Sequence, residues 1–395
     1  VDYGVYRVSC CIQRCISVSE KVEGSKFGSQ MVKFRLARST IDGRIGCIEE
    51  WGGVVVSNCT PSLLLYTRAG HVPHLTWEVF STQVHLSQPP ILQLVLSSLL
   101  DFLPAVSAWG RGVASFCGIP RGIPVHLSML DPLEERKNGY NDSKSVAVFT
   151  PAGKAALTPA SYLSALSSLR TDSFETLLDY DIAPNATFKR LGKSVERTRA
   201  FSDKINDEAP SGSCLFAYIG GGECTLTRRR MSYEIASKAT AVAADFVGFQ
   251  LAEIEKWKKL ADESFSNVPV SSIRVAPGSF SPSEVVALVG LGVDVFDSSW
   301  AVGEAEAGRA FTLHKDFPAT PEFTLTHFNT KDEMNELAQP WNRCPCYTCT
   351  NYSTGYISHL ISAKELLASI LLVIHNLTEY DRALRLIRKH LQASF

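Results

Sequence analysis

The sequence predicts an α/β fold: a (β/α)8 barrel of the TIM type, with an N-terminal antiparallel lead-in and a C-terminal helical subdomain. Two observations support this prediction. Short apolar runs alternate with helical segments over about 250 residues, the usual extent of such a barrel. The 395 residues, 45% of them hydrophobic, are also enough for a core of that size. The chain from residue 343 onward differs, since it combines a cysteine-containing turn with helices.

The first regular pattern begins near residue 31. Val32, Phe34 and Leu36 alternate with polar residues, and the apolar runs Val54–Val56 and Leu63–Tyr66 follow. Alternation and short apolar runs bounded by glycines are typical of strands, so residues 31–66 are predicted to form the antiparallel lead-in. Residues 1–30 contain both acidic and basic residues and no apolar segment of a signal peptide, and we expect a disordered extension there.

The middle of the chain, residues 31–342, is predicted to be one barrel domain. Strand–helix repetition at this spacing indicates βαβ units and a parallel sheet. Ser281, Pro282 and Glu284 form a helix-start signature. The expected strands are Ile91–Leu100, Val146–Phe149, Cys214–Ile219, Ala244–Phe249, Ile273–Ala276 and Val293–Phe296. The expected helices are Pro159–Arg170, Ser194–Ile205, Leu226–Lys238, Glu253–Glu263 and Ser281–Gly290, before a polar connector over residues 313–342.

Overall composition excludes several classes of protein. Lys plus Arg is 39 and Asp plus Glu is 40, so a polyanion could bind only at a local patch. Eleven cysteines are too few for a disulfide scaffold of this length and fit a reducing compartment. No apolar run approaches the roughly 20 residues that span a bilayer, so no transmembrane segment is expected.

Cys344, Cys346, Cys349 and His375 form the most specific chemical pattern in the chain. Three thiols within six residues, with a histidine on a distant apolar segment, match a closed tetrahedral Cys3His zinc set. Closed sets are usually structural, so we expect one structural Zn²⁺ that joins the cysteine turn to a helix in a subdomain of residues 343–395. The alternative is three reduced cysteines and a core histidine.

Other candidate residues are less specific. Asp297 follows an apolar run and would lie at the carboxyl end of a barrel strand, where it could be a nucleophile, a base or only a helix cap. Gly220–Gly222 at another strand end could admit a ligand or form a turn. His71 and His74 fit a loop pair better than metal ligands. Basic residues near the C-terminus could contact phosphates or be a solvated helix end: Arg385, Arg388 and Lys389.

Several of these segments together resemble the tRNA-guanine transglycosylase family. The resemblance covers most of residues 31–395, and its most specific part is the cysteine set with the tail Ile374–Leu377. It implies a zinc-bearing (β/α)8 barrel that exchanges guanine in the anticodon wobble position of tRNA. The further segments that carry it are Gly292–Asp297, Gly308–Thr312, Tyr356–Leu360, Lys364–Leu367 and Ile387-Arg388.

The departures from the catalytic members of that family lie in the base-binding motifs. Asp297 falls on their nucleophilic aspartate, but Gly220 stands where they have a base-contacting glutamine. Gly303 and Glu306 stand where they have arginines, and Leu94–Leu100 contains no Asp-Ser-Gly-Gly-Phe-Gln motif. A nucleophile without base-binding partners cannot position a purine, and positioning supplies much of the rate.

The chain therefore resembles the non-catalytic members more than the catalytic ones. That resemblance implies a heterodimer with the catalytic subunit of queuine tRNA-ribosyltransferase, tRNA as a second partner held partly by Arg385, Arg388 and Lys389, and one Zn²⁺. It also implies a cytoplasmic location with peripheral association with the mitochondrial outer membrane. Two alternatives remain: an active transglycosylase that uses Asp297, and a zinc-stabilised scaffold with no role in RNA chemistry.

Overall fold

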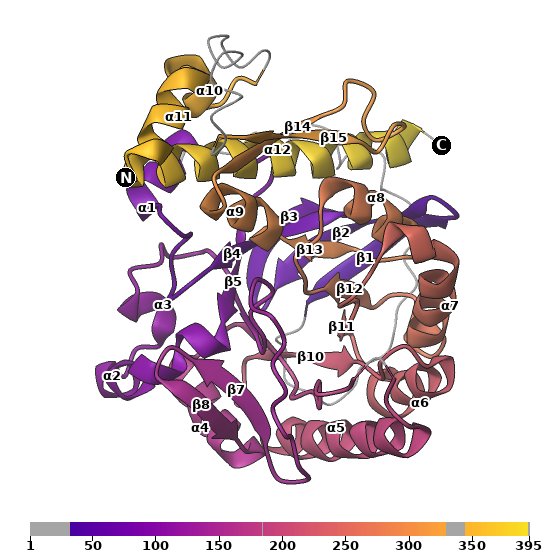
Figure 1. The fold of residues 1–395 in the computed structure, drawn as a ribbon. Helices are drawn as coiled ribbons and strands as arrows, with labels where there is room; N and C mark the ends of the chain where they lie inside the picture. Colours follow the sequence, from indigo (N-terminus) through magenta and orange to yellow (C-terminus); the bar gives the residue numbers. More distant parts are fainter. Residues whose placement is uncertain (1–31, 184, 329–343, 394–395) are drawn as a thin grey trace.

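A closed barrel of eight parallel strands forms the centre of the molecule, as the sequence predicted (Figure 1). The computed structural model describes residues 32–183, 185–328 and 344–393. Neighbouring strands all pair in parallel, and the last strand, β13, closes the ring on the first, β4. The barrel strands are β4 (Ser62–Thr67), β5 (Ile91–Val95), β6 (Val125–Ser128), β9 (Ser173–Glu175), β10 (Cys214–Ile219), β11 (Ala241–Ala244), β12 (Ile273–Ala276) and β13 (Val295–Asp297).

Helices surround this ring in the order expected of repeated βαβ units. The predicted helix start at Ser281 is confirmed, because Ser281 and Glu284 form a reciprocal capping box at α8. Among the described residues the helices are α1 (Trp77–Gln83), α2 (Leu103–Trp109), α3 (Val113–Phe116), α4 (Pro159–Leu169), α5 (Phe188–Glu208), α6 (Thr225–Ala236), α7 (Ile254–Phe265), α8 (Pro282–Gly290), α9 (Ser299–Glu306), α10 (Tyr347–Asn351), α11 (Thr354–Ser362) and α12 (Leu366–Ala393).

An antiparallel sheet of β1 (Lys33–Thr40), β2 (Gly43–Trp51) and β3 (Val54–Cys59) precedes the barrel and closes its amino-terminal end. Trp51 is fully buried there, stacks on Phe216 with ring centroids 5.1 Å apart, and donates from Nε1 to Ser173 Oγ at 2.8 Å. It shares a separate core cluster with the first residues of several barrel strands, including Ile91 and Ile273. The opposite end, where the strands finish, is called the barrel mouth below.

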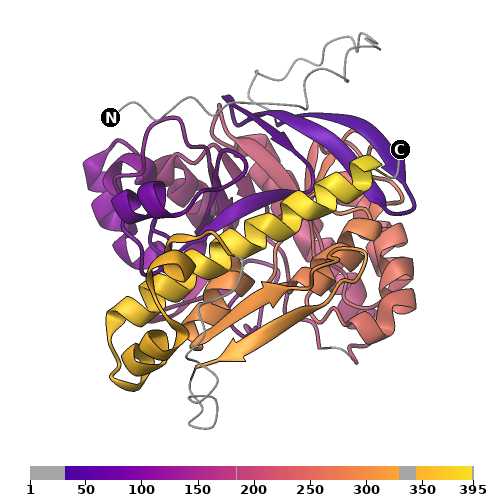
Figure 2. The same ribbon diagram turned by 90° about the horizontal axis from the view of Figure 1, so that it is seen from above.

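The long helix α12 covers the seam between β13 and β4. In Figure 2 it crosses the molecule beside the hairpin of β14 (Arg309–Leu313) and β15 (Phe323–His327). Tyr380 donates to Phe280 O at 2.8 Å, and Asn376 donates to Ala301 O at 3.1 Å, so the helix is tied to the segments that follow β12 and β13. No helix in the described part of the chain is long and apolar enough to cross a membrane.

Two strand predictions were wrong about topology. Leu63–Tyr66 belongs to the barrel strand β4 rather than to the antiparallel lead-in, because it is buried on both faces as parallel strands are. Val146–Phe149 is not a barrel strand. It forms β7 (Val146–Thr150) of an antiparallel hairpin with β8 (Gly153–Leu157), since a tight turn at Pro151 and Ala152 reverses the chain.

Other predicted elements differ from the observed ones in their boundaries. The strand expected at Ala244–Phe249 is β11, which ends at Ala244; Phe246 and Phe249 instead pack against Trp257 of α7. The strands β6 and β9 were not predicted. The expected connector over residues 313–342 contains β15, and its residues 329–342 lie outside the described part of the chain. The extension expected over residues 1–30 also lies outside it.

Candidate metal centre and barrel mouth

Cys344, Cys346, Cys349 and His375 lie together in the structure. One ligand atom from each residue lies within 4.8 Å of the other three. The Sγ atoms of Cys346 and Cys349 are 3.6 and 3.1 Å from His375 Nδ1. In a tetrahedral zinc site, bond lengths of about 2.3 Å to sulfur and 2.0 Å to nitrogen separate the ligand atoms by roughly 3.5–3.8 Å. The cluster could therefore hold one metal ion with little rearrangement.

Local structure presents the sulfur atoms to one point. Cys346 is the N-cap of α10, and its Sγ accepts from the backbone N–H of Cys349 at 3.4 Å. Thr348 donates from Oγ1 to Leu371 O at 2.6 Å, which fastens this turn to α12. The side chains of Cys346 and Cys349 are buried, so a bound ion would be largely shielded from water.

His375 is oriented by the neighbouring hairpin. Its Nε2 lies 2.9 Å from Phe311 O on β14. Because a carbonyl oxygen only accepts, the proton sits on Nε2 and the Nδ1 lone pair points to the sulfur atoms. The histidine is 1% exposed and comes from the middle of α12. A metal here would join the cysteine turn, the long helix and the β14–β15 hairpin.

The thiols of this cluster do not titrate independently. Hydrogen bonds from the thiols of Cys344 and Cys349 lower the pKa of Cys346 to about 3. Contacts with the same neighbours raise the pKa of Cys349. The Cys346 thiolate thus forms readily, while the Cys349 thiol needs a cation to replace its proton. This is the chemistry of a thiolate-rich zinc or other soft-metal site.

Asp297 lies at the carboxyl end of β13, where it was expected, but its side chain is fully buried. Oδ2 accepts from the backbone N–H of Gly278 at 2.8 Å, and Oδ1 accepts from that of Ser299 at 2.9 Å. Burial raises the pKa of the carboxyl to about 6, although these hydrogen bonds lower it. A ribose carbon could reach this carboxylate only if the surrounding side chains moved.

Two leucine side chains occupy space at the barrel mouth. They lie beside Gly220 and Gly303, where the catalytic proteins that the sequence resembles carry larger residues. A Cβ on Gly220 would lie 2.8 Å from Leu178 Cδ1, and a Cβ on Gly303 would lie 2.8 Å from Leu133 Cδ2. Leu178 is 1% exposed. Larger side chains at residues 220 and 303 are therefore excluded unless these leucines move, because real Cβ contacts are essentially never this short.

Glu306 belongs to an ion-pair network within the chain. Arg68 donates from Nη1 to Glu306 Oε1 at 2.8 Å and from Nε to the Tyr66 hydroxyl at 2.8 Å. Tyr66 in turn donates to Asp131 Oδ1 at 2.8 Å. His74 Nε2 lies 3.3 Å from the same Glu306 oxygen, whereas the His71 ring lies tilted against that of Trp77, with ring centroids 6.1 Å apart. His71 and His74 do not form a metal site in this arrangement.

The segment after β6 contributes residues that the sequence did not single out. Arg136 forms a two-bond ion pair with Asp245, at 2.8 and 3.0 Å, next to the end of β11. Burial opposes ionisation of Asp245, but the guanidinium of Arg136 outweighs it, so the pKa of Asp245 lies below its usual value. The run Asp131-Pro132 directly after an apolar stretch was the available signal, since it marks a turn at a strand end.

The three basic residues of α12 are not equivalent. Arg385 and Lys389 are exposed. Arg388 is 7% exposed and donates to Pro61 O and to Ser87 Oγ, both at 2.7 Å. The side chain of Arg388 therefore binds groups inside the protein, and it does not lie on the surface that Arg385 and Lys389 form. Because Pro61 and Ser87 precede β4 and β5, this part of α12 lies toward the amino-terminal end of the barrel.

Two aromatic surfaces are exposed on helices outside the ring of strands. The tyrosine surface runs along α10 and α11, where Tyr352 and Tyr356 stack with ring centroids 5.9 Å apart and Tyr356 is 44% exposed. The Trp109 surface lies on α2 and α3, where Trp109 is 44% exposed and Arg111 lies 3.9 Å from its ring centroid. Exposed clusters of large aromatic rings commonly mark protein interfaces.

Comparisons with known proteins agree on one family. A family model described as queuine tRNA-ribosyltransferase matches residues 40–394. A Caenorhabditis briggsae protein named queuine tRNA-ribosyltransferase accessory subunit 2 is 43% identical over 375 residues, which cover 92% of this chain and 99% of that protein. The Caenorhabditis elegans protein of the same name is 41% identical over 371 residues, with the same coverage. The Drosophila melanogaster protein of that name is 28% identical over 335 residues, 81% of this chain and 80% of that protein.

Proposed function

Because the chain belongs to the queuine tRNA-ribosyltransferase family, we propose that it is the non-catalytic subunit of a heterodimeric queuine tRNA-ribosyltransferase. In this proposal a catalytic partner exchanges guanine for queuine at the anticodon wobble position of tRNA. The chain described here supports that exchange by dimerising with the partner and by binding tRNA.

The packing at the barrel mouth is the main observation in favour of a non-catalytic role. Leu178 occupies the space beside Gly220, and Asp297 has no exposed surface. A transglycosylase must place a purine and its ribose against its nucleophile, and the fully buried Asp297 is not accessible to them in this arrangement. The loss of catalytic motifs in the sequence and the packing at the mouth point to the same role.

The two aromatic surfaces support the dimerisation part. The tyrosine surface belongs to the subdomain that the Cys3His cluster holds together, so a bound metal would keep it in shape. We propose that the metal is one structural Zn²⁺. Large rings such as Tyr356 and Trp109 supply most of the energy at the centre of typical interfaces. A cytoplasmic location with peripheral association with the mitochondrial outer membrane is part of the proposal and has only the family resemblance in its favour.

Guanine exchange provides the test. The chain alone, the catalytic subunit alone and the two together are incubated with tRNA and labelled guanine. We expect label in tRNA only when the catalytic subunit is present, and faster exchange by the pair. Asp297→Asn in this chain should leave exchange by the pair unchanged.

Two other outcomes would replace the proposal. Exchange by the chain alone that Asp297→Asn abolishes would identify an active transglycosylase. Absence of both partner binding and salt-dependent tRNA binding would favour the zinc-stabilised scaffold.

A further inference from the structure

The segment before the β7–β8 hairpin and one face of that hairpin together form an aromatic and basic surface, called the Tyr140 platform here. Its members are Lys137, Tyr140, Phe149 and Lys154. Lys137 Nζ lies 5.4 Å from the ring centroid of Phe149, and Lys154 Nζ lies 5.4 Å from that of Tyr140. Phe149 and Lys154 are direct cross-strand partners, so the two cation–π pairs lie next to each other. The platform is on the surface and takes no part in the barrel core.

The backbone holds Tyr140 outward in an unfavourable conformation. Its φ is +50°, a left-handed value that a large side chain adopts only at an energetic cost. Its N–H donates to Asn138 Oδ1 at 3.0 Å and to Asp181 Oδ2 at 2.9 Å. Both neighbours, Gly139 and Asn141, are buried, yet the Tyr140 side chain is 80% exposed. The fold thus fixes an aromatic ring in solvent where folding alone gains little from it.

The ammonium groups of the two platform lysines are available to bind an anion. Within the described residues, neither Lys137 nor Lys154 forms an ion pair with a carboxylate, and this includes Glu134 and Glu135 of the same loop. Three other acids lie nearby, and each accepts hydrogen bonds from other groups: Asp142 from Lys144 N at 2.8 Å, Asp181 from Tyr140 N at 2.9 Å, and Asp101 from Ala152 N at 3.1 Å. Exposed rings interleaved with free cations are the features that bind unpaired nucleotides, since bases stack on the rings and phosphates face the cations.

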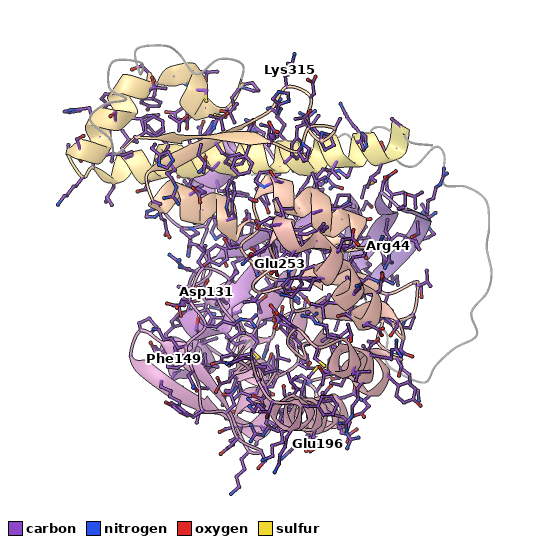
Figure 3. All side chains as sticks on the ribbon, turned by 45° about the vertical axis from the view of Figure 1, so that its right-hand side comes forward. Arg44, Asp131, Phe149, Glu196, Glu253 and Lys315 are labelled. Carbon is purple, nitrogen blue, oxygen red and sulfur yellow. The ribbon has the colours of Figure 1, made fainter. Side chains whose placement is uncertain are left out.

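We propose that the Tyr140 platform binds an unpaired nucleotide of RNA, with its base stacked on Tyr140 and the adjoining phosphates facing Lys137 and Lys154. The choice of tRNA as that RNA rests on the proposed function above. Figure 3 shows Phe149 of the platform on the same side of the molecule as Asp131 at the barrel mouth, and Arg44 on the opposite side. The platform is therefore a separate contact from Arg385 and Lys389, which lie toward the amino-terminal end of the barrel.

RNA affinity tests the platform directly. The probe is a fluorescently labelled anticodon stem–loop RNA, titrated with the chain alone and with the heterodimer. We expect Tyr140→Ala to raise Kd about 5- to 100-fold, because one stacked base is lost, while Tyr140→Phe keeps the affinity. Lys154→Ala should reduce the slope of log Kd against log salt by about 0.7, the value of one phosphate contact to a single strand.

Matched controls are available on the other side of the ring. Tyr233→Ala removes a tyrosine that is 67% exposed on α6, and Lys258→Ala removes an exposed lysine on α7. Thermal unfolding of each variant shows whether the chain still folds, and the salt slope of Lys154→Ala, compared with that of Lys258→Ala, keeps the test valid if Tyr140→Ala does not fold. Binding by Tyr140→Ala equal to binding by Tyr233→Ala would overturn the inference. Loss of partner binding with unchanged RNA affinity would also overturn it and would assign the platform to a protein.

Different experimental results would contradict the inference and the proposed function. If the unsubstituted heterodimer does not exchange guanine, the proposed function fails, while the RNA affinity of the chain alone still decides the inference. If exchange is normal and the platform variants bind RNA like the controls, only the inference fails.

Discussion

The side chain of Leu178 lies against Gly220, so that a Cβ at residue 220 would be 2.8 Å from Leu178 Cδ1. Leu178 is almost fully buried, and Gly220 directly follows β10 at the barrel mouth. The two residues come from adjacent strand ends, since β9 and β10 are paired. The packing of Leu178 at this part of the mouth therefore depends on the absence of a side chain at residue 220.

This contact predicts a coupled pair of substitutions. Gly220→Gln should lower the free energy of unfolding by about 1–3 kcal/mol through overpacking, and Leu178→Ala by about 2–5 kcal/mol through a cavity. The double variant should lose less than the two losses combined, because the glutamine can enter the space of the leucine. Urea unfolding measures all three. Gly192→Ala is the control: nothing lies within 4 Å of its Cβ position in α5, so stability should rise by up to about 1 kcal/mol. Strict additivity would contradict this account of the mouth.

Removal of one ligand should empty the metal centre. Cys346→Ser or His375→Ala is expected to reduce bound zinc from about one per chain to near zero, measured by atomic emission after gel filtration. Stability should fall by about 4 kcal/mol when free zinc is a thousand times its Kd for the unsubstituted chain. Cys214→Ser, a buried cysteine outside the cluster, should keep the metal. Unchanged zinc content in either ligand variant would remove the site.

Asp297 should make stability depend on pH. Burial raises its pKa from 3.8 to about 6, so the folded chain holds the proton more tightly than the unfolded chain. The stabilising contribution of this group is fully present below pH 3.8 and is lost as the pH rises through about 6. The stability of Asp297→Asn relative to the unsubstituted chain should therefore rise by about 2 kcal/mol between pH 4 and pH 7.

Chemical denaturation across that pH range measures this difference. Asp316→Asn, at a carboxylate that is 59% exposed, serves as the control and should show almost no such rise. A flat difference for Asp297→Asn would mean that the carboxylate is better solvated than its burial indicates.

The basic residues of α12 should separate into two kinds. Arg388→Ala should cost about 3–5 kcal/mol, because it removes a buried cation next to Asp381 and leaves Pro61 O without that donor. Arg385→Ala and Lys389→Ala should change stability by less than about 0.5 kcal/mol. If those two residues contact tRNA, each variant should lower the salt dependence of binding. Thermal unfolding and RNA titration of the three variants give both readouts. Equal stability of all three would contradict the buried role of Arg388.

Substitutions in the tyrosine surface and in the Trp109 surface should weaken the heterodimer. Tyr356→Ala and Trp109→Ala are each expected to weaken the heterodimer by more than about 1 kcal/mol, as central interface aromatics do. Sedimentation of the mixed subunits over a range of concentrations measures the change. Tyr233→Ala should have no effect, since Tyr233 is a solvent-exposed tyrosine away from both surfaces. A heterodimer that tolerates both substitutions would move the interface elsewhere.

The sequence predicted the barrel and the Cys3His cluster because both depend on local patterns. It missed β6 and β9, and the reason is physical. His126 and Ser173 face the barrel interior and bond to each other at 2.8 Å, as do Ser128 and Glu175 at 3.2 Å. These short strands carry polar side chains inside the barrel, so an apolar run does not mark them.

The packing at the mouth could not be predicted, because it depends on contacts between distant segments. Gly220 and Gly303 show that the glutamine and arginine side chains of the catalytic members are missing. The sequence does not reveal that Leu178 and Leu133 occupy the space beside these glycines. The basic tail illustrates the same limit. Arg388 and Lys389 are adjacent, and the rotation of about 100° per residue along a helix places one inside and the other outside.

The seam beneath α12 sets the order in which the chain can complete its fold during synthesis. The first barrel strand, β4, has its partner Val295–Asp297 more than two hundred residues later, and the helix that covers their junction ends at Ala393. Until then an open strand edge and its apolar flank face the solvent. A nascent chain would therefore keep this junction uncovered until α12 has been synthesised, and a stop codon within α12 would leave part of the junction exposed.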